Sequence, residues 1–386
     1  MRVGLSADVY QERILPHVSR TFALTIPQLP RGLRRAVTNA YLLCRIADTI
    51  EDEPAVSAEE THVFLQRFAA VVSGREPPEP LARDIEQRLS DRTLPAERDL
   101  VRNTSLVIEI THSLPRDQQT AIQRCIDLMC YGMHHFQTTA SLQGLARSSD
   151  LDSYCYYVAG VVGEMLTELF CSYSSGAAAR RTALRELAPS FAQGLQMTNI
   201  LKDMWEDRSR GACWLPREVF ARHGIDLAEL KPEPYDERFG AALTELIGVA
   251  HAHLRNALAF TLLLPREEPG IRLFCLWSVG LAVRTLRRIQ RNPRFRSGAD
   301  VKVSHAEVAL TRLGTQLAVR HDAALLSLFD WAAGDLPLAA PAEVGRRSRA
   351  ATNAAPAPEA VMEYRRNILQ PQLGGASYPR DGSSAP

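Results

Sequence analysis

The chain has 386 residues, of which 46% are hydrophobic and 23% are charged, so it contains enough apolar material for a sizeable globular core. The formal net charge is only +1, which argues against a nucleic-acid-binding protein, because such proteins usually carry an excess of basic residues on one face. The seven cysteines form no CxxC pair, the N-terminus has no apolar signal core, and no run reaches the about 18 apolar residues of a membrane span. We therefore expect a cytoplasmic protein without a transmembrane segment.

Helical periodicity dominates the sequence and strand-like alternation is scarce, so we predict an all-α protein. In chain order, the predicted helices span residues 31–53, 57–73, 95–113, 116–140, 150–173, 178–209, 236–264, 269–291 and 304–334. No linker-like stretch interrupts residues 1–335, which we interpret as one helical domain. Residues 336–386 are rich in Ala, Pro, Gly and Ser and are expected to form a disordered tail that the chemistry does not need.

A basic, hydroxyl-rich segment, HVSRTFALTIPQLP (17–30), precedes the first predicted helix. Within it, Ser19, Arg20 and Phe22 are typical of an element that binds an anion, because arginine makes charged, bidentate contacts to phosphate. An SRT tripeptide that stands alone is more often a loop or a helix cap. Its interpretation therefore depends on the two acidic segments further along the chain.

The first acidic segment, AYLLCRIADTIEDEP, places Tyr41, Arg45, Asp48 and Asp52 at spacings of four, three and four residues. On an α-helix these positions form one stripe, and apolar residues cover much of the remaining surface. This helix should therefore be largely buried. Two carboxylates plus Glu51 near the end of a buried helix are costly unless a cation neutralises them, and Arg45 offsets only one of the three charges.

The predicted helix at 150–173 opens with DLDSYCYYVAGVVG, in which Tyr154 and two further tyrosines surround the start of an apolar run. The run contains Gly160 and Gly163. Glycine inside a helix costs about 1 kcal/mol relative to alanine, so these glycines indicate a local need for space. Close packing of another helix and room for a ligand are both compatible with the pattern.

The second acidic segment, QMTNILKDMWEDRSRG, places Gln196, Asn199, Asp203 and Asp207 on one helical stripe. Both acidic segments therefore contain the pattern D-x-x-E-D. Oxygen ligands in pairs suit Mg²⁺, which typically binds one or two carboxylates and leaves its other positions to water and phosphate oxygens. A solvated acidic helix face would explain one such segment. Two copies in apolar helices favour a cage for a magnesium–diphosphate cluster.

Together, these segments resemble the squalene/phytoene synthase family, whose members join two prenyl diphosphates head to head. The resemblance spans about residues 15–305, and the two aspartate motifs are specific to this kind of enzyme. It implies an all-α isoprenoid-synthase fold with a central cavity and the two motif helices on opposing walls. It also implies farnesyl diphosphate as the substrate and Mg²⁺ as a cofactor.

The resemblance assigns roles to residues by their position. Asp48 and Asp52 match the first magnesium-binding pair, and Asp203 and Asp207 match the second. Tyr154 matches the tyrosine thought to stabilise cationic intermediates or to assist ionisation. Counting these five as the catalytic set, the expected substrate-binding residues are Ser19, Arg20, Phe22, Tyr41, Arg45, Gln196, Asn199 and Lys202. Asn199 also stands at the family's usual spacing before the second pair and is expected among the metal ligands.

A cofactor is implied by two further stretches. YCYYVAGVVG is closer to the squalene synthase branch of the family, which typically reads YCHYVAG, than to phytoene synthases. GADVKVSHAEV (298–308) resembles the segment that carries basic residues for NADPH, with Lys302 at the first basic position and Ser304 at the second. Lys302 and Asn199 are therefore the expected NADPH contacts. The sequence contains no GxGxxG, so NADPH would bind without a Rossmann fold.

The implied activity is the condensation of two farnesyl diphosphates through presqualene diphosphate, followed by NADPH reduction to squalene. The alternative is a dehydrosqualene, phytoene or presqualene diphosphate synthase, which performs no reduction. Two more distant alternatives are a terpene cyclase on the same fold and a noncatalytic helical scaffold whose acidic stripes bind calcium or a basic partner. Because the product would be a very apolar lipid, we also expect transient contact with the inner membrane surface.

Overall fold

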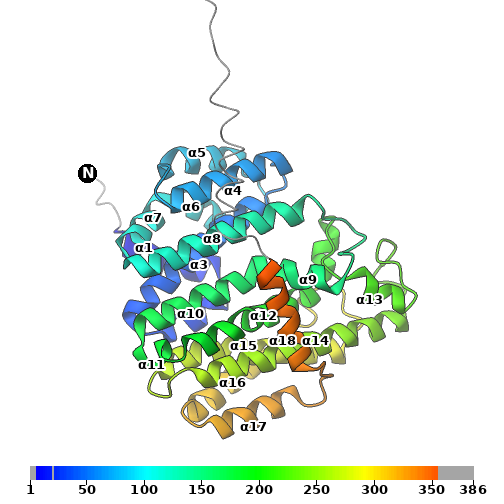
Figure 1. Cartoon of the computed structure of the whole chain (residues 1–386). Coiled ribbons are helices and arrows are strands. Elements are labelled where there is room, and N and C mark those ends of the chain that lie inside the picture. The colour runs from blue at the N-terminus through cyan, green and yellow to red at the C-terminus, as the bar shows by residue number, and fades with distance from the viewer. Residues whose placement is uncertain (1–5, 20, 355–386) are drawn as a thin grey trace, which may run out of the picture. The chain divides into compact units, whose positions relative to one another are not determined.

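The regular secondary structure is entirely helical over residues 6–19 and 21–354, which the computed structural model describes, so the predicted all-α fold is confirmed (Figure 1). The first half contains α1 (Ala7–Val18), α2 (Phe22–Thr25), η1 (Ile26–Gln28), α3 (Arg31–Glu51), α4 (Ala58–Val72), α5 (Pro78–Arg88), α6 (Pro95–Arg102), α7 (Thr104–Ser113) and α8 (Arg116–Gln137). The second half contains α9 (Ser148–Cys155), η2 (Tyr156–Gly160), α10 (Val161–Tyr173), α11 (Ser175–Ala178), α12 (Arg181–Ser209), α13 (Arg217–Arg222), α14 (Glu237–Leu263), α15 (Pro269–Arg291), α16 (His305–Ala318), α17 (Asp322–Ala333) and α18 (Pro341–Ala354).

Helix α12 lies in the middle of the bundle and contacts α10, α14 and α15 (Figure 1). A Cβ atom at Gly163 would lie 2.1 Å from the carbonyl oxygen of Ala188, so a glycine is required for α10 to approach α12 this closely. A Cβ atom at Gly194 would lie 3.1 Å from the backbone of His253 on α14. Of the two interpretations of Gly163, the structure supports close helix packing.

Three predicted helices are interrupted. The segment 95–113 divides into α6 and α7 at Asn103, whose side chain donates a hydrogen bond to the Asp99 carbonyl at 2.8 Å. The segment 304–334 divides into α16 and α17. The segment 150–173 contains η2, a single π-helical turn between α9 and α10. Such turns are frequent at functional sites, so this one marks the region of Tyr154 for attention.

Several helices lie where the sequence predicted none, among them α5 and α1. Helix α5 starts inside the proline-rich stretch GREPPEP, with Pro78 at its first position. Proline is tolerated there because the N–H that it lacks would have no partner inside the helix. Helix α1 is capped by Ser6, whose hydroxyl accepts a hydrogen bond from the Val9 amide, and packs against α3 and α7. Both helices support α3, directly or through α6 and α7, and α3 carries the first acidic motif.

The structure corrects the predicted boundary at residue 335. Helix α18 lies beyond it and contacts α9, α12 and α14. Its buried face consists of Val344, Ser348 and Ala351, and such small side chains let a helix pack closely although the segment is not strongly apolar. The compact unit extends to Ala355. Residues 355–386 lie outside the described residues, so the rest of the expected tail stays a prediction.

Helix α14 has the length and composition of a membrane span, the one such helix among the described residues. However, 72% of the 18-residue window concerned is buried inside the protein, and core helices meet the same criteria. Its contacts with α12 and α15 give it a role in the interior of the bundle.

Candidate active site

The first acidic motif lies at the C-terminal end of α3. Asp48 is in its last turn and Asp52 is its C-cap residue, whose amide donates to the Asp48 carbonyl at 2.8 Å. Acidic residues at this end of a helix are unfavourable, because the helix dipole is negative there. Arg45 lies 3.6 Å from the Asp48 carboxylate and 2.5 Å from that of Glu97. One arginine is therefore shared between two acids, and α3 is otherwise well buried, as predicted.

The electrostatics of this helix end favour an added cation. Burial raises the pKa of Asp48 to about 7, and the neighbouring Asp52 adds to this effect against the lowering by Arg45. Burial also raises the pKa of Asp52, and holds that of Glu51 well above its usual range. Three carboxyl groups resist ionisation together, so a bound cation would stabilise their charged forms.

The second acidic motif lies in the last two turns of α12. Lys202 pairs with the Asp203 carboxylate at 2.8 Å. Burial raises the pKa of Asp207, and the charges of Asp203 and of Asp52 on the other motif contribute to the shift. Gln196 and Asn199 precede Asp203 on the same helix, as predicted from their spacing.

Arg210 links the two motifs. Its guanidinium lies 2.6 Å from the Asp207 carboxylate and 3.9 Å from that of Asp52. The two acidic helix ends, 155 residues apart in sequence, therefore meet across one arginine. We did not single out Arg210 from the sequence. Its position three residues after Asp207, which allows an i,i+3 ion pair, is the signal that could have identified it.

Tyr154 lies between the motifs in an aromatic cluster. Its ring stacks on Trp214 with centroids 4.2 Å apart and meets Phe136 edge-on at 5.3 Å. Burial holds the pKa of Tyr154 well above its usual range, and the charges of Glu51, Asp207 and Asp52 reinforce the shift. The phenol is therefore protonated at neutral pH. The sequence did not identify Trp214, which follows α12 in an irregular segment.

The predicted anion-binding segment is assembled in part. The Ser19 hydroxyl accepts a hydrogen bond from the Phe22 amide at 3.0 Å, and the Phe22 ring lies 5.1 Å from that of Tyr41. The Tyr41 hydroxyl donates to the Val18 carbonyl at 2.9 Å. These contacts bring the segment to the face of α3 that carries Arg45. Arg20 lies outside the described residues, so its assignment stays a prediction.

The loop that carries Lys302 lies against the second motif. The Gly298 amide donates to the Glu206 carboxylate at 2.8 Å, and a Cβ atom at Gly298 would lie 2.7 Å from the Asp203 carboxylate. Lys302 itself is exposed. Ser304, at the second expected basic position, is instead the N-cap of α16 and shares a capping box with Glu307. Its hydroxyl is thus engaged in helix capping.

The donors of the two motifs fit Mg²⁺ by their chemistry, since they are carboxylate oxygens in pairs, and the pKa values of Asp48, Asp52 and Asp207 are raised. Among the described residues, no three His, Cys, Asp or Glu side chains are grouped so as to hold an ion by themselves. A magnesium site here would therefore need water and phosphate oxygens to complete it, which is the usual environment of Mg²⁺ beside a diphosphate.

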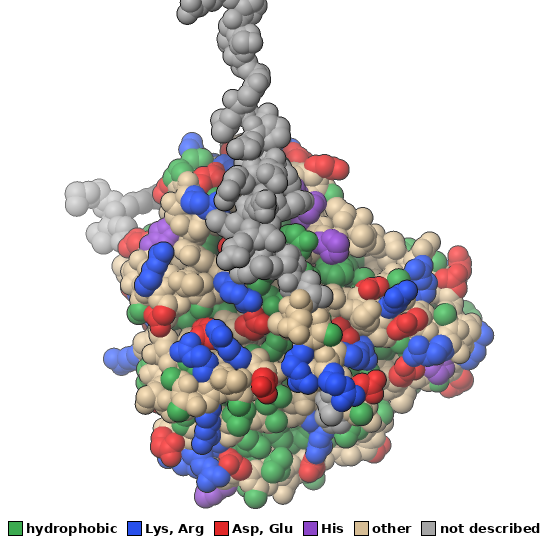
Figure 2. Space-filling view, in the orientation of Figure 1, with side chains coloured by type: hydrophobic (Ala, Val, Ile, Leu, Met, Phe, Trp, Pro, Cys, Tyr) green, Lys and Arg blue, Asp and Glu red, His purple; other side chains and the backbone are tan. Residues whose placement is uncertain are grey.

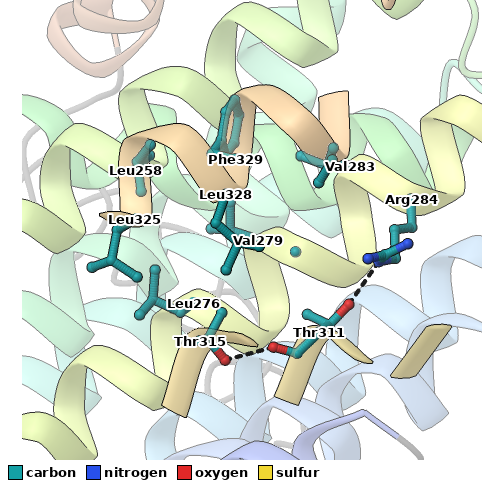
Figure 3. Close-up of a pocket in the computed structure, with 12 residues that line it drawn as sticks. Leu258, Leu276, Val279, Val283, Arg284, Thr311, Thr315, Leu325, Leu328 and Phe329 are labelled. Atoms are coloured by element: carbon teal, nitrogen blue, oxygen red, sulfur yellow. Dashed lines mark hydrogen bonds between the residues drawn. The ribbon is translucent and has the colours of Figure 1, made fainter. Parts of the chain in front are cut away.

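A separate pocket lies between α14, α15, α16 and α17 (Figure 3). Its volume is about 30 Å³, which is the space of one water molecule and far too little for a prenyl chain. Leu276, Val279 and Phe329 line it, and the Arg284 side chain donates to Thr311 at its edge. It contains none of the predicted site residues. The central cavity that the resemblance implies stays a prediction.

The family model described as squalene/phytoene synthase matches residues 15–307. Squalene synthase ERG9 of Candida albicans is 30% identical over 297 residues, which cover 74% of this chain and 62% of that protein. Squalene synthase BSS of Botryococcus braunii is 30% identical over 304 residues, which cover 75% and 60%. The chain thus spans about three fifths of the length of these curated relatives.

Two solved structures share the fold. The complex of TcSQS with BPH1237 has a TM-score of 0.70 at 23% identity and covers 91% of this chain and 99% of that one. A dehydrosqualene synthase in complex with a ligand has a TM-score of 0.59 at 19% identity, with coverage of 83% and 97%. At these identities the likeness concerns the fold alone. The family match over residues 15–307, which contains both aspartate motifs, shows that the chain belongs to the squalene/phytoene synthase family.

Proposed function

We propose that this chain is a squalene synthase, which would join two molecules of farnesyl diphosphate through presqualene diphosphate and reduce the product with NADPH. The observation that carries the proposal is the meeting of Asp52 and Asp207, from two D-x-x-E-D helices, at Arg210. The curated relatives named squalene synthase support this choice of product.

The two aspartate pairs would hold the magnesium–diphosphate cluster. Asp48 and Asp52 on α3 and Asp203 and Asp207 on α12 are the expected ligands, with Asn199 beside the second pair. Bound Mg²⁺ supplies positive charge that makes diphosphate a better leaving group. From the chain itself, Arg45 and Lys202 would add charge-assisted hydrogen bonds to the same phosphates, together with the residues Ser19, Arg20, Phe22, Tyr41 and Gln196 that we expect to contact substrate.

The aromatic cluster would protect the carbocation that forms when diphosphate leaves. The double bond of the second farnesyl diphosphate attacks this cation, and loss of a proton closes the cyclopropane ring. Tyr154, Trp214 and Phe136 offer aromatic faces that attract positive charge, and their close packing excludes the water that would quench it. Because its pKa is raised, Tyr154 acts as a neutral phenol rather than as a phenolate base.

The reductive step is assigned to the loop that lies against the second motif. Lys302 and Asn199 are the expected contacts to NADPH, which supplies a hydride to the last carbocation. The hydrogen bond from Gly298 to Glu206 supports this assignment, since it keeps the Lys302 loop close to the diphosphate end of the site.

The second candidate is a dehydrosqualene, phytoene or presqualene diphosphate synthase, which performs no reduction step. The observation that favours it is Ser304, whose hydroxyl is engaged in the capping box of α16 where a basic contact to NADPH was expected. Without a hydride, the last cation would lose a proton and give dehydrosqualene. Release of the intermediate before the last cation forms would give presqualene diphosphate. C20 substrates in place of farnesyl diphosphate would give phytoene.

A product assay by mass spectrometry tests the proposal. Purified protein is incubated with farnesyl diphosphate and Mg²⁺, with and without NADPH, and in parallel with the C20 substrate. Squalene that forms only with NADPH supports the proposal, and dehydrosqualene or presqualene diphosphate in both reactions favours the second candidate. Asp48→Asn and Asp203→Asn should abolish turnover, whereas Asp91→Asn on the surface should not. Absence of any prenyl product from either substrate would contradict both candidates.

We also propose that the protein acts in the cytoplasm with transient contact to the inner membrane surface. The free thiols of all seven cysteines support a reducing compartment. Basic and acidic side chains are interspersed on the face in Figure 2, so this face has no broad basic patch for anionic lipids. Contact would therefore depend on the apolar product, and fractionation of cells with and without substrate supply would test it.

A further inference from the structure

Helix α18 makes a specific polar contact with the segment that presents Tyr154. It packs against α9, α12, α14 and the π-helical turn η2. It lies beyond residues 15–307, the part of the chain that the family model matches. Its buried face carries Ser348, and Arg347 stands beside it on the same turn. Arg347 contacts Asp152 of α9 directly, and Ser348 is connected to the same residue through Gln193.

Arg347 binds the Asp152 side chain directly. Its Nε lies 2.7 Å from the Asp152 Oδ2 atom, and only 3% of the aspartate side chain is exposed. Burial raises the pKa of Asp152, and the guanidinium opposes that shift. Without Arg347, the structure would contain a buried carboxylate with no countercharge, and such groups are strongly unfavourable.

Ser348 holds the backbone of the same residue through one intermediate. Its hydroxyl donates to the Gln193 Oε1 atom at 2.5 Å, and the Gln193 amide donates to the Asp152 carbonyl at 2.9 Å. That carbonyl also accepts the backbone N–H of Tyr156, at the point where α9 passes into the π-helical turn. Two adjacent residues of α18 therefore fix Asp152 by its carboxylate and by its carbonyl.

Asp152 precedes Tyr154 by two residues on the same short helix, so a contact that fixes one also sets the position of the other. We propose that Arg347 and Ser348 are positioning residues that act through Asp152 to hold Tyr154 against Trp214 in the reacting geometry. The contacts among α18, α9 and Trp214 do not depend on the function of the protein, whereas their effect on catalysis rests on the function proposed above.

The position of Tyr154 can be followed without any assay of activity. The chain contains four tryptophans, Trp205, Trp214, Trp277 and Trp331, and only Trp214 is stacked on Tyr154 among the described ring contacts. Protein labelled with 5-fluorotryptophan should give four ¹⁹F resonances, with that of Trp214 assigned from a Trp214→Phe variant. Movement of the Tyr154 ring changes its ring current at Trp214, and hence this one chemical shift.

Four variants of the full chain define the test. Arg347→Met should move the Trp214 resonance and leave the other three unchanged. Arg347→Lys should restore part of the shift, because it returns the charge but not the guanidinium geometry. In the double variant Asp152→Asn/Arg347→Met the carboxylate is also removed, so its displacement should be smaller than that of Arg347→Met alone. Arg102→Met, which breaks an α6–α5 ion pair with Glu86, is the matched control and should move nothing.

Kinetics supply the second measurement. In Arg347→Met, kcat for presqualene diphosphate formation should fall about tenfold, which corresponds to about 1.4 kcal/mol of transition-state free energy, while KM for farnesyl diphosphate stays unchanged. An unmoved Trp214 resonance in Arg347→Met, or equal broadening of all four resonances, would show a purely structural role and overturn the inference. A moved resonance in a protein whose wild type forms no prenyl product would support the positioning and reject only the proposed function.

Discussion

At the scale of single residues, Arg210 is the cation that allows the two acidic motifs to face each other. It pairs with Asp207 and lies within 3.9 Å of Asp52, whose charge contributes to the raised pKa of Asp207. An incoming magnesium–diphosphate cluster would compete with this guanidinium for the same oxygens. Arg210 therefore stabilises the unliganded site and limits the gain from ion binding.

Replacement of Arg210 by Met should lower the melting temperature in the absence of divalent ions, because the carboxylates then repel one another. The rise in melting temperature on addition of Mg²⁺ with inorganic diphosphate should be larger than in the wild type. Differential scanning calorimetry with and without the ions measures both effects. Arg222→Met, which removes a surface pair with Glu245, should change neither, and an unchanged Mg²⁺ response in Arg210→Met would contradict this role.

The burial of His253 allows us to predict how the free energy of unfolding depends on pH. It is fully buried on α14, its Nδ1 lies 2.9 Å from the Ser190 hydroxyl, and burial lowers its pKa from 6.5 to about 3. Between these two values the unfolded chain binds a proton that the folded chain does not. Proton binding to the unfolded chain at His253 therefore lowers the free energy of unfolding as the pH falls from 6.5 towards 3. Above pH 6.5 His253 is neutral in both states and this loss is absent.

In urea titrations, His253→Gln should reduce the loss of stability between pH 6.5 and pH 5 by about 2 kcal/mol, the share expected of one such group. His305→Gln, at an exposed position, should leave the pH dependence unaltered. If the wild type and His253→Gln lose stability in parallel over this range, His253 is not protonated on unfolding as argued.

At the scale of elements, a buried arginine joins α15 to its neighbours. Arg272 is 1% exposed and donates to the Leu264, Val319 and Leu262 carbonyls and to the Asp322 carboxylate. It thus satisfies the last carbonyls of α14 and ties the start of α17 to α15. Arg266 binds the same carboxylate from an exposed position.

Because the two arginines share Asp322, they form a matched pair for mutation. Arg272→Met should lower the free energy of unfolding by about 3–5 kcal/mol, since it leaves several buried acceptors without a donor. Arg266→Met should cost less than about 1 kcal/mol, as exposed pairs do. Chemical denaturation of both variants provides the comparison, and equal losses would mean that burial does not decide the contribution of these pairs.

The sequence predicted helices most accurately where the helical periodicity extends over many residues and places similar residues along one stripe. The bounds of α3, α14 and α15 agree closely with the predicted ranges, and both acidic stripes lie on the helices expected of them. Short elements were missed because their signals are local. Pro78 looks like a loop residue unless its place at a helix start is known, and α18 has too few apolar residues to suggest burial.

The site was predictable where its residues share a helix and not where separate segments meet. Spacing alone placed Asp48 with Asp52 and Asp203 with Asp207. Nothing in the sequence indicates that Trp214 stacks on Tyr154, or that Arg347 reaches a carboxylate 195 residues away. Such pairings depend on how distant helices pack, which periodicity within one helix does not report.

At the scale of the whole molecule, the compact unit requires α18 but is not expected to require the residues after this helix. A chain that ends at residue 355 should unfold at the same denaturant concentration as the full chain, because the compact unit is complete there. A chain that ends at residue 340 should be less stable, since it exposes the surface that covers Val344 and Ala351 and leaves Asp152 unpaired. Equal midpoints for all three chains would contradict this division.

The distance in sequence between Arg347 and Asp152 also bears on when the protein becomes active during its synthesis. A ribosome adds about 5–20 residues per second, so the 195 residues between the two partners take roughly 10–40 s to make. Once the chain has been made as far as Arg210, it contains both aspartate motifs and Tyr154, yet the π-helical turn still lacks its final support. Helix α18 thus acts as a timing element, and the chain is expected to reach full catalytic competence only after residue 354 has been translated.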